Sequence, residues 1–441
     1  MEGGQTAALA QPAKERSEAG TRRWMLFVLL LVCLINYADR SVVNAVAEPL
    51  RRELGLSDLQ LGVLSGLSFA LLYSGLGIPF ARLAERFSRV RIIAAATFVW
   101  SLMTVLCGTA TNYVQLALMR LGVGVGEAGF MAPATSLLGD RFPRERRAFA
   151  TSIMMLGVPF GALIGAMSGG MIAQSMGWRW AFIIMGLPGI LIALLVWTTV
   201  REPVRGTQDA HAGTDVPPFW TVARQCFANR TFVHVLMGGL LGGFGLHGLG
   251  GFLGVYFVRV HELPYGTAGM LYGLQTFASV GGGLLISGFL ANRLGQRSLR
   301  WNSLLPAIGM ALCVPIYIAA FSVSDLALAV TLIVSAGISL VMHYGPSVAI
   351  VQNLATPRTR ATTIAVYQLC VNVISMGIGP MLIGFLSDVF SARLAPEMGE
   401  QQALGVGLRY ALMASTVFYA WGAVHYFLAQ RGEEVRPRAA A

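Results

Sequence analysis

Long apolar stretches alternate with short polar segments along the whole chain. Twelve of these stretches approach the roughly 20 residues that an α-helix needs to cross a bilayer. They cover residues 24–48, 60–82, 90–110, 113–138, 147–174, 178–200, 231–258, 265–290, 301–321, 326–351, 361–387 and 405–429. A transmembrane β-barrel would instead need segments of about ten residues with a polar inner face. The pattern therefore predicts an all-α integral membrane protein with twelve transmembrane helices.

The first stretch lies near the amino terminus, where a signal peptide would lie, but its other features argue against one. This stretch is about 25 residues long, it carries Asp39 and Arg40, and no small-residue cleavage site follows it. We therefore interpret it as a retained membrane helix.

The composition supports a membrane protein. Of the 441 residues, 55% are hydrophobic and 12% are charged, against roughly 25% charged residues in a soluble domain. The five cysteines are scattered and show no paired ligand spacing. Neither a metal site nor a cofactor is therefore expected.

The distribution of basic residues predicts the topology. The formal net charge is +11, but 24 of the 32 lysines and arginines lie in segments on the side of the amino terminus, and five lie on the opposite side. By the positive-inside rule, both termini are cytoplasmic in a multi-pass protein of the plasma (inner) membrane. The positive charge thus reflects orientation in the membrane, and no nucleic-acid partner is expected.

The chain divides into two similar halves. We predict a cytoplasmic amino-terminal tail (1–23), a six-helix bundle (24–200), a cytoplasmic linker (201–230), a second six-helix bundle (231–429) and a cytoplasmic carboxy-terminal tail (430–441). The sequence LAER that begins at Leu83, after the second stretch, recurs at an offset of 207 residues as LANR from Leu290, after the eighth. Parallel six-helix repeats of this kind are the build of the major facilitator transporters, so we expect two pseudo-symmetric bundles.

Four ionisable residues lie well inside the predicted helices, namely Asp39, Arg40, Arg120 and Glu127. A charge at the bilayer centre costs about 2.5 to 3.5 kcal/mol or more, so each of these residues needs a partner or a water-filled cavity. Arg120 and Glu127 are two turns apart and share one face of the fourth helix. If the first helix is the neighbour of the fourth, all four residues form one polar cluster.

Other charged residues lie near helix ends, where long side chains reach water easily. They are Glu48, Asp388 and Arg409. We expect them at the membrane surface.

Two interpretations of the four-charge cluster stay open. It can be a structural salt-bridge network that holds helices together. Alternatively, burial favours the neutral form of a carboxylate and a nearby arginine favours the charged form. A substrate anion that engages Arg40 or Arg120 would then free a carboxylate to bind a proton, which makes Asp39 and Glu127 candidate proton carriers.

Glycines and uncharged polar residues complete the predicted site. Gly122, Gly124 and Gly126 thin the fourth helix between its two charges and allow another helix to approach closely. Further candidates for substrate binding are Asn36, Tyr37, Tyr367, Gln368 and Asn372. Each of these polar residues can equally be a hydrogen-bonded packing residue.

Several motifs together resemble the spinster family of major facilitator transporters. They are NYADR (36–40), ERFSR (85–89), RLGVGVGEAGF (120–130), APATSLLGDRF (132–142) and WRWAF (178–182). The resemblance implies a proton-linked transporter of lysophospholipids or sphingoid phosphates. It further implies that Asp39 and Glu127 are central to coupling, and that Arg40 and Arg120 support head-group binding.

The connection after the second helix, ARLAERFSR from Ala81, resembles the superfamily signature G-x-L-x-D-R-x-G-R-[RK]. The resemblance implies that Glu85, in the place of the aspartate, caps the eleventh helix. Together with Arg86 and Arg89 it would latch the outward-open state. Alternatively, these arginines only anchor the protein at the cytoplasmic surface.

The sequence thus predicts a proton-coupled secondary active transporter that works by alternating access. Its expected partners are protons, membrane lipids and a small amphiphilic or anionic substrate, and we expect a monomer. A symporter or exporter of a small organic anion or drug would use the same four charges. A non-transporting receptor or scaffold is the alternative from another class, but no sizeable domain lies outside the predicted helices. No nucleophile elbow or phosphate loop indicates an enzyme.

Overall fold

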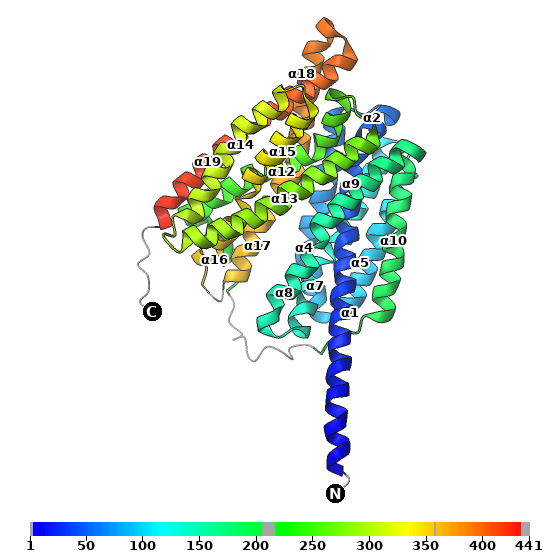
Figure 1. Ribbon diagram of the computed structural model, residues 1–441, viewed down its shortest axis with the longest axis vertical. Helices are drawn as coiled ribbons and strands as arrows, with labels where there is room; N and C mark the ends of the chain where they lie inside the picture. The colour runs from blue at the N-terminus through cyan, green and yellow to red at the C-terminus, as the bar shows by residue number, and fades with distance from the viewer. Residues whose placement is uncertain (1–2, 205–216, 357–358, 434–441) are drawn as a thin grey trace.

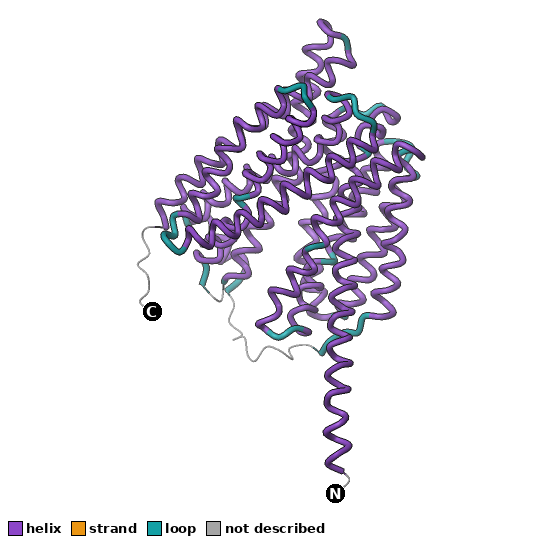
Figure 2. Tube along the Cα trace, in the orientation of Figure 1, coloured by secondary structure: helices purple, strands orange, loops and turns teal. Residues whose placement is uncertain are grey.

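A computed structural model describes residues 3–204, 217–356 and 359–433. All regular secondary structure in these residues is helical, and twelve segments are long and apolar enough to cross a membrane. Figures 1 and 2 show the helices as two bundles side by side. In Figure 1 the first bundle is coloured blue to green and the second green to red. The predicted fold, twelve membrane helices in two pseudo-symmetric six-helix bundles, is confirmed.

The first half contains α1 (Gly3–Ala45), α2 (Ala47–Leu54), α3 (Asp58–Gly62), the π-helical η1 (Val63–Leu67), α4 (Ser68–Arg86), α5 (Arg89–Cys107), α6 (Tyr113–Ala128), α7 (Met131–Arg141), α8 (Arg144–Met155), α9 (Gly157–Met176) and α10 (Trp178–Thr199). The second half contains α12 (Arg230–Val260), α13 (Tyr265–Gly295), α14 (Trp301–Ser322), α15 (Leu326–Val341), α16 (Tyr344–Leu354), α17 (Arg360–Val371), the π-helical η2 (Asn372–Met376), α18 (Gly377–Met398) and α19 (Glu400–Glu433). The short helix α11 (Phe219–Ala228) lies between the halves in sequence and packs on α12 and α17.

The two halves share one apolar core on one side of the membrane only. We call the side on which α1 begins and α19 ends the termini side, and the opposite side, at which α2 lies, the α2 side (Figure 1). Val46 and Leu50 of the first half belong to the same buried core as Phe252 and Ile383 of the second. The termini side of the first half has a core of its own, which includes Trp100. The halves are therefore joined mainly on the α2 side.

The spans begin and end within about five residues of the predicted limits, except in the eleventh. Helix α18 continues to Met398, eleven residues beyond the predicted end of that span at residue 387. The added turns contain alanine, arginine and leucine, which are good helix formers although the segment is not apolar. With the start of α19 they project beyond the bundles on the α2 side (Figure 1). Hydropathy alone marks the membrane boundary and misses a helix that continues past it.

The predicted tails and linker contain helix where the structure describes them. Helix α1 begins at Gly3, within the predicted tail, and α11 lies within the predicted linker 201–230. Residues 205–216 of that linker and residues 434–441 of the predicted carboxy-terminal tail lie outside the described residues.

A row of glycines brings the backbones of α1 and α9 together. A Cβ atom added at Gly161 or Gly165 would lie 2.2 Å from the carbonyl oxygen of Leu34 or Ala38, respectively, so no side chain fits at either position. At Gly169, one turn further along α9, an added Cβ would meet ordinary contacts at 3.4 Å and beyond. This close packing fixes the part of α1 that carries the predicted charges.

We expect Gly165→Ala to destabilise the protein by about 1 to 3 kcal/mol, because the added methyl group must displace the α1 backbone. Gly169→Ala, in the same glycine row, should change stability little. Thermal unfolding of the purified protein in detergent measures both effects. Equal unfolding temperatures for the two variants would contradict this account of the α1–α9 contact.

Candidate functional site

Arg40 and Glu127 form a direct ion pair inside the first half. Nε of Arg40 donates to Oε2 of Glu127 at 2.5 Å, and the two side chains are 16% and 0% exposed. Neighbouring residues of a helix point about 100° apart, so Asp39 faces elsewhere. Its Oδ2 accepts a hydrogen bond from Oγ1 of Thr104 in α5 at 3.3 Å. Of the two adjacent charges in α1, the arginine thus faces Glu127 and the aspartate faces the bundle interior.

Three aromatic rings surround the guanidinium of Arg40. Its Cζ atom lies 4.9 Å from the ring centroid of Tyr37, 4.6 Å from that of Phe69 and 4.5 Å from that of Tyr73. A cation over aromatic faces at such distances is stabilised electrostatically, more so when it is shielded from water. Phe69 and Tyr73 also stack on each other, with centroids 5.1 Å apart. The rings and Glu127 together hold Arg40 in one position.

Arg120 lies near this pair without a direct carboxylate contact. Among the described residues it has no ion-pair partner within 4 Å, although Asp39 and Glu127 are within electrostatic range. Its Nε atom, Oδ1 of Asp39 and Oε1 of Glu127 are buried and have no hydrogen-bond partner among the described residues. Arg120 also lines a small, mostly apolar cavity of about 10 Å³, the least volume that a water molecule needs. The predicted cluster therefore forms, but only one of its possible ion pairs is closed.

The glycines of α6 face α4 and α5. An added Cβ at Gly124 would lie 2.7 Å from the carbonyl oxygen of Phe69 in α4, and one at Gly126 would lie 2.6 Å from the amide nitrogen of Trp100 in α5. Gly122 faces Met103 of α5. The expectation that these glycines allow another helix to approach closely is confirmed, and the helices that approach are α4 and α5. Long side chains, rather than close backbones, connect α1 with α6.

The remaining predicted binding residues separate into two groups. Asn36 is 2% exposed and lies beside Glu127. Gln368 contacts the hydroxyl of Tyr344 at 3.4 Å, and Tyr344 lies within electrostatic range of Tyr37 across the two halves.

Tyr367 lies within electrostatic range of Tyr344, but its direct partners among the described residues are in the second half. Its hydroxyl packs against Gly239, beside Ser347 and Tyr426 in the second half. Asn372, which begins η2, is partly exposed.

The three residues predicted as a latch lie at the termini side of the first half. Arg89 is buried and binds four residues. Its Nε lies 2.8 Å from Glu202, and it forms an ion pair to Asp140 and hydrogen bonds to Oγ of Ser136 at 2.9 Å and to the carbonyl oxygen of Pro203 at 3.3 Å. Glu85 and Arg89 line a cavity of about 410 Å³ between α4 and α7. Arg86 is exposed. Arg89 thus ties α5 to α7 and to the segment after α10.

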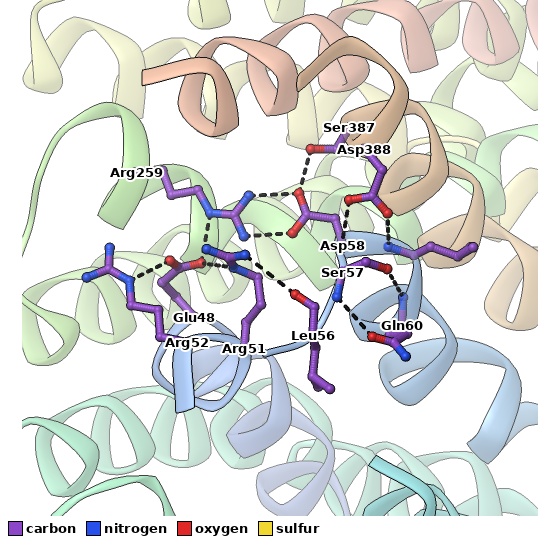
Figure 3. A network of polar contacts seen from close by, with 11 residues as sticks. Glu48, Arg51, Arg52, Leu56, Ser57, Asp58, Gln60, Arg259, Ser387 and Asp388 are labelled. Atoms are coloured by element: carbon purple, nitrogen blue, oxygen red, sulfur yellow. Dashed lines mark hydrogen bonds and ion pairs between the residues drawn. The ribbon is translucent and has the colours of Figure 1, made fainter. Parts of the chain in front are cut away.

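A second charged network joins the two halves on the α2 side (Figure 3). The guanidinium of Arg259, at the end of α12, contacts both carboxylate oxygens of Asp58 at 2.7 Å. Its Nε donates to Glu48 at 2.8 Å. All three side chains are at most 4% exposed. Bidentate geometry of this kind gives strong, directional pairing.

Asp388 of α18 extends the network from the second half. Its two carboxylate oxygens accept from the backbone amides of Asp58 and Leu59, each at 2.9 Å, and its neighbour Ser387 donates to Asp58 at 2.6 Å. The expectation that Glu48 reaches water at a helix end is therefore wrong, whereas Asp388 is partly exposed and also bonded to backbone amides. Both lie where the halves close on each other and find protein partners there.

The pKa of Glu48 reflects these partners. Burial works to raise it, but the guanidiniums of Arg259 and Arg51 outweigh burial and hold the pKa below its usual value. Glu48 is therefore charged when the protein is folded at neutral pH.

Sequence reasoning missed the aromatic rings Phe69 and Tyr73 and the pair of Asp58 with Arg259. Asp58 precedes the second predicted span by two residues, and Arg259 follows the seventh by one, so both lie outside the predicted spans. An acid and a base at the ends of two spans on the same side were the available signal. Phe69 and Tyr73, one turn apart, lie at the depth of Arg40 but carry no charge to mark them.

Comparisons with known proteins agree with this architecture. The family model of the Major Facilitator Superfamily matches residues 29–380. A protein of Mycolicibacterium smegmatis named MFS-type efflux pump is 33% identical over 407 residues, which cover 91% of each chain. A sphingosine-1-phosphate transporter of Danio rerio is 24% identical over 418 residues, covering 90% of this chain and 81% of the relative.

A solved structure is similar over nearly its whole length. It is the crystal structure of a bacterial homolog to the human lysosomal transporter spinster, described as inward-facing and unoccupied. It superimposes with a TM-score of 0.87 at 33% identity and covers 95% of this chain and 99% of that chain.

We expect Glu48→Gln to lower the free energy of unfolding at pH 7 by about 1.5 to 3 kcal/mol, because it removes a charged acceptor from buried arginines. The pKa of Glu48 is lower in the folded protein than in the unfolded chain. Its stabilising effect is therefore complete at neutral pH and is lost as the pH falls below the ordinary value of 4.5. Thermal unfolding in detergent from pH 7 downward should show the two proteins converging in acid; a constant difference would contradict the assignment.

Proposed function

Because this chain belongs to the major facilitator superfamily and is a transporter of the spinster type, we propose that it moves amphiphiles of the lysophospholipid or sphingoid-phosphate class by proton-coupled alternating access. The observation that carries the proposal is the pair of Arg40 and Glu127 within its aromatic surround, next to Asp39 and Arg120. Two acids and two bases lie together there with only one ion pair closed.

The arrangement offers a way to exchange a proton for an anion. Arg40 is 16% exposed, so a phosphate can reach its guanidinium, whereas Glu127 is fully buried behind it. An anion that draws Arg40 away leaves Glu127 without the direct ion pair that it has among the described residues. A buried carboxylate without a partner is unfavourable unless it binds a proton. Asp39, whose contact is a hydroxyl rather than a base, is the second proton site.

The substrate head group would bind between the halves. Arg40 and Tyr37 come from the first half, and His247 and Tyr344 of the second half lie within electrostatic range of them. Gln368 reaches the same place through Tyr344. Arg120 supplies a second positive charge for a phosphate. The relative named as a sphingosine-1-phosphate transporter supports an amphiphile with such a head group.

The closed α2 side and the separate core on the termini side support a conformation that is open toward the termini side. The arginine-rich segments on that side place it in the cytoplasm of a plasma (inner) membrane protein. In the opposite conformation, Glu85 would cap the eleventh helix with Arg86 nearby. The cavity of about 410 Å³ beside Glu85 and Arg89 has room for such a contact.

Export of a small organic anion or drug is the second candidate. The relative of Mycolicibacterium smegmatis named as an efflux pump favours it. The same arginines would bind a compact anion, so the two candidates differ in the apolar part of the substrate rather than in the charged cluster.

We expect Asp39→Asn and Glu127→Gln each to reduce transport driven by a pH gradient at least about tenfold, because each variant removes a site that must bind and release a proton. Proteoliposomes assayed with and without a pH gradient, across lysophospholipids, sphingoid phosphates and small organic anions, measure this effect. Glu397→Gln, at an exposed position on the projecting end of α18, is the matched control and should transport like the wild type. Transport that is indifferent to the gradient in the wild type would refute the coupling.

The aromatic rings around Arg40 should contribute to substrate binding. We expect Tyr73→Leu to weaken substrate binding about fivefold or more, because a cation–π contact of about 1 kcal/mol that fixes Arg40 is lost. Tyr73→Phe retains the ring and should bind nearly as well as the wild type. Titration of the purified protein with a lysophospholipid compares them, and equal loss in both variants would assign the effect to the hydroxyl group instead.

A further inference from the structure

We propose that Asp388 and Gln174 are a matched pair of gating residues, each of which caps the first turn of a membrane helix in the opposite half. The inference rests on the proposed alternating access and assigns the closure of the α2 side to these two contacts. The contact at Asp388 is the stronger, charged cap, and the contact at Gln174 is its weaker, neutral counterpart.

The first contact completes the hydrogen bonding of the second span. Helix α3 continues through η1 into α4, and the first amides of any helix lack intrahelical acceptors. Two of them are satisfied within the turn, since the amide of Gln60 donates to Oγ of Ser57 and Oε1 of Gln60 accepts from the amide of Ser57. The other two, those of Asp58 and Leu59, donate to Asp388 of the opposite half. This helix start is therefore fully capped only when the halves are closed.

The second contact repeats the first at the eighth span. Helix α13 begins after Pro264, which offers no side-chain acceptor. The amide of Gly266 donates to Oε1 of Gln174, in α9 of the first half, at 2.8 Å. At both contacts, therefore, a side chain from a span of one half caps the start of a span in the other half.

The two contacts are equivalent under the internal repeat. The offset of 207 residues that relates the second and eighth spans carries Leu59 to Gly266, the two residues whose amides donate. An offset of 214 residues in the fifth and eleventh spans carries Gln174 to Asp388, the two acceptors. The Leu59 amide and its acceptor Asp388 therefore have their counterparts in the Gly266 amide and Gln174.

Close backbone contacts follow the same offsets. Gly62 falls on Gly269, and an added Cβ would lie 2.3 Å from the carbonyl oxygen of Pro380 in the first case and 2.6 Å from that of Ala166 in the second. Pro380 and Ala166 are themselves 214 residues apart. Four pairs of positions thus follow the two offsets. The two caps are therefore products of the repeat rather than isolated contacts.

The two caps differ in strength because their chemistry differs. Asp388 offers a carboxylate to two amides, and a negative charge at a helix start is favoured by the helix dipole. Gln174 offers one neutral amide oxygen to one amide, and its side chain is exposed. The bidentate pair of Arg259 with Asp58 strengthens only the contact at Asp388, since Tyr265 stands at the position equivalent to Asp58. Charge therefore locks the pair of α3 and α18, while α9 and α13 are held by close apolar packing and one neutral bond.

The experiment measures opening of the α2 side without transport. Nitroxides at Thr109→Cys and Ser324→Cys, on exposed α2-side loops of the two halves, report the distance between the halves by double electron–electron resonance. Cys370 is replaced by alanine, because the other four native cysteines are buried. We expect Asp388→Asn to raise the population at long distance at least threefold, and Gln174→Glu, which adds charge to the weaker cap, to reduce it at least twofold.

Ser57→Ala is the matched control, because it removes a cap of the same turn from within the same half. It should lower the unfolding temperature and leave the distance distribution unchanged. If Asp388→Asn does not fold, Gln174→Ala and Gln174→Glu carry the test, with shifts in opposite directions. An equal effect of Asp388→Asn and Ser57→Ala, or no shift in any variant, would overturn the proposal. Because the distances are measured without substrate or flux, a failed transport assay leaves this result independent.

Discussion

The buried guanidinium of Arg259 pairs the second half of this protein with two carboxylates of the first. It is nearly inaccessible to water, and a buried charge is tolerated only with close, well-oriented partners. Those partners, Asp58 and Glu48, both lie in the other half, so separating the halves on this side would expose or strand three charges at once. The shared apolar core beside them fits this constraint, since it excludes the water that would weaken the ion pairs.

The two charged clusters of the molecule have opposite designs. In the network around Arg259 the charged groups all have partners, and the pairing crosses between the halves. In the interior of the first half, Arg120 and Asp39 remain close but unpaired, and buried polar atoms there have no partner among the described residues. A saturated network favours one arrangement, whereas an unsaturated cluster can accept an ion or a proton. The unsaturated cluster around Arg120 and Asp39 is therefore suited to binding, and the saturated network around Arg259 is suited to holding the two halves together.

The fold was predictable because membrane spans leave a strong signal in hydropathy, and the repeat at Leu83 and Leu290 marked the two halves. Of the site, sequence reasoning found the residues that carry charge inside a span, because such residues are rare. It could not find Phe69 or Tyr73, which resemble lipid-facing residues until Arg40 is placed over them. It also could not place Glu48 and Asp388, because one sequence does not show which helix ends of the two halves meet. The projecting end of α18 was missed because a helix can continue where apolar character stops.

The π-helical turns η1 and η2 give the spans joined by Asp388 a property that their neighbours lack. Each inserts a widened turn within a span, η1 in the first third of the second and η2 in the eleventh, and η1 packs against α18 while η2 packs against α4. A widened turn disrupts the regular ladder of backbone hydrogen bonds and is a preferred place for a helix to bend. Each of these spans can therefore behave as two rigid rods with a flexible joint. The α2 end of such a span can therefore move by a different distance from its termini end.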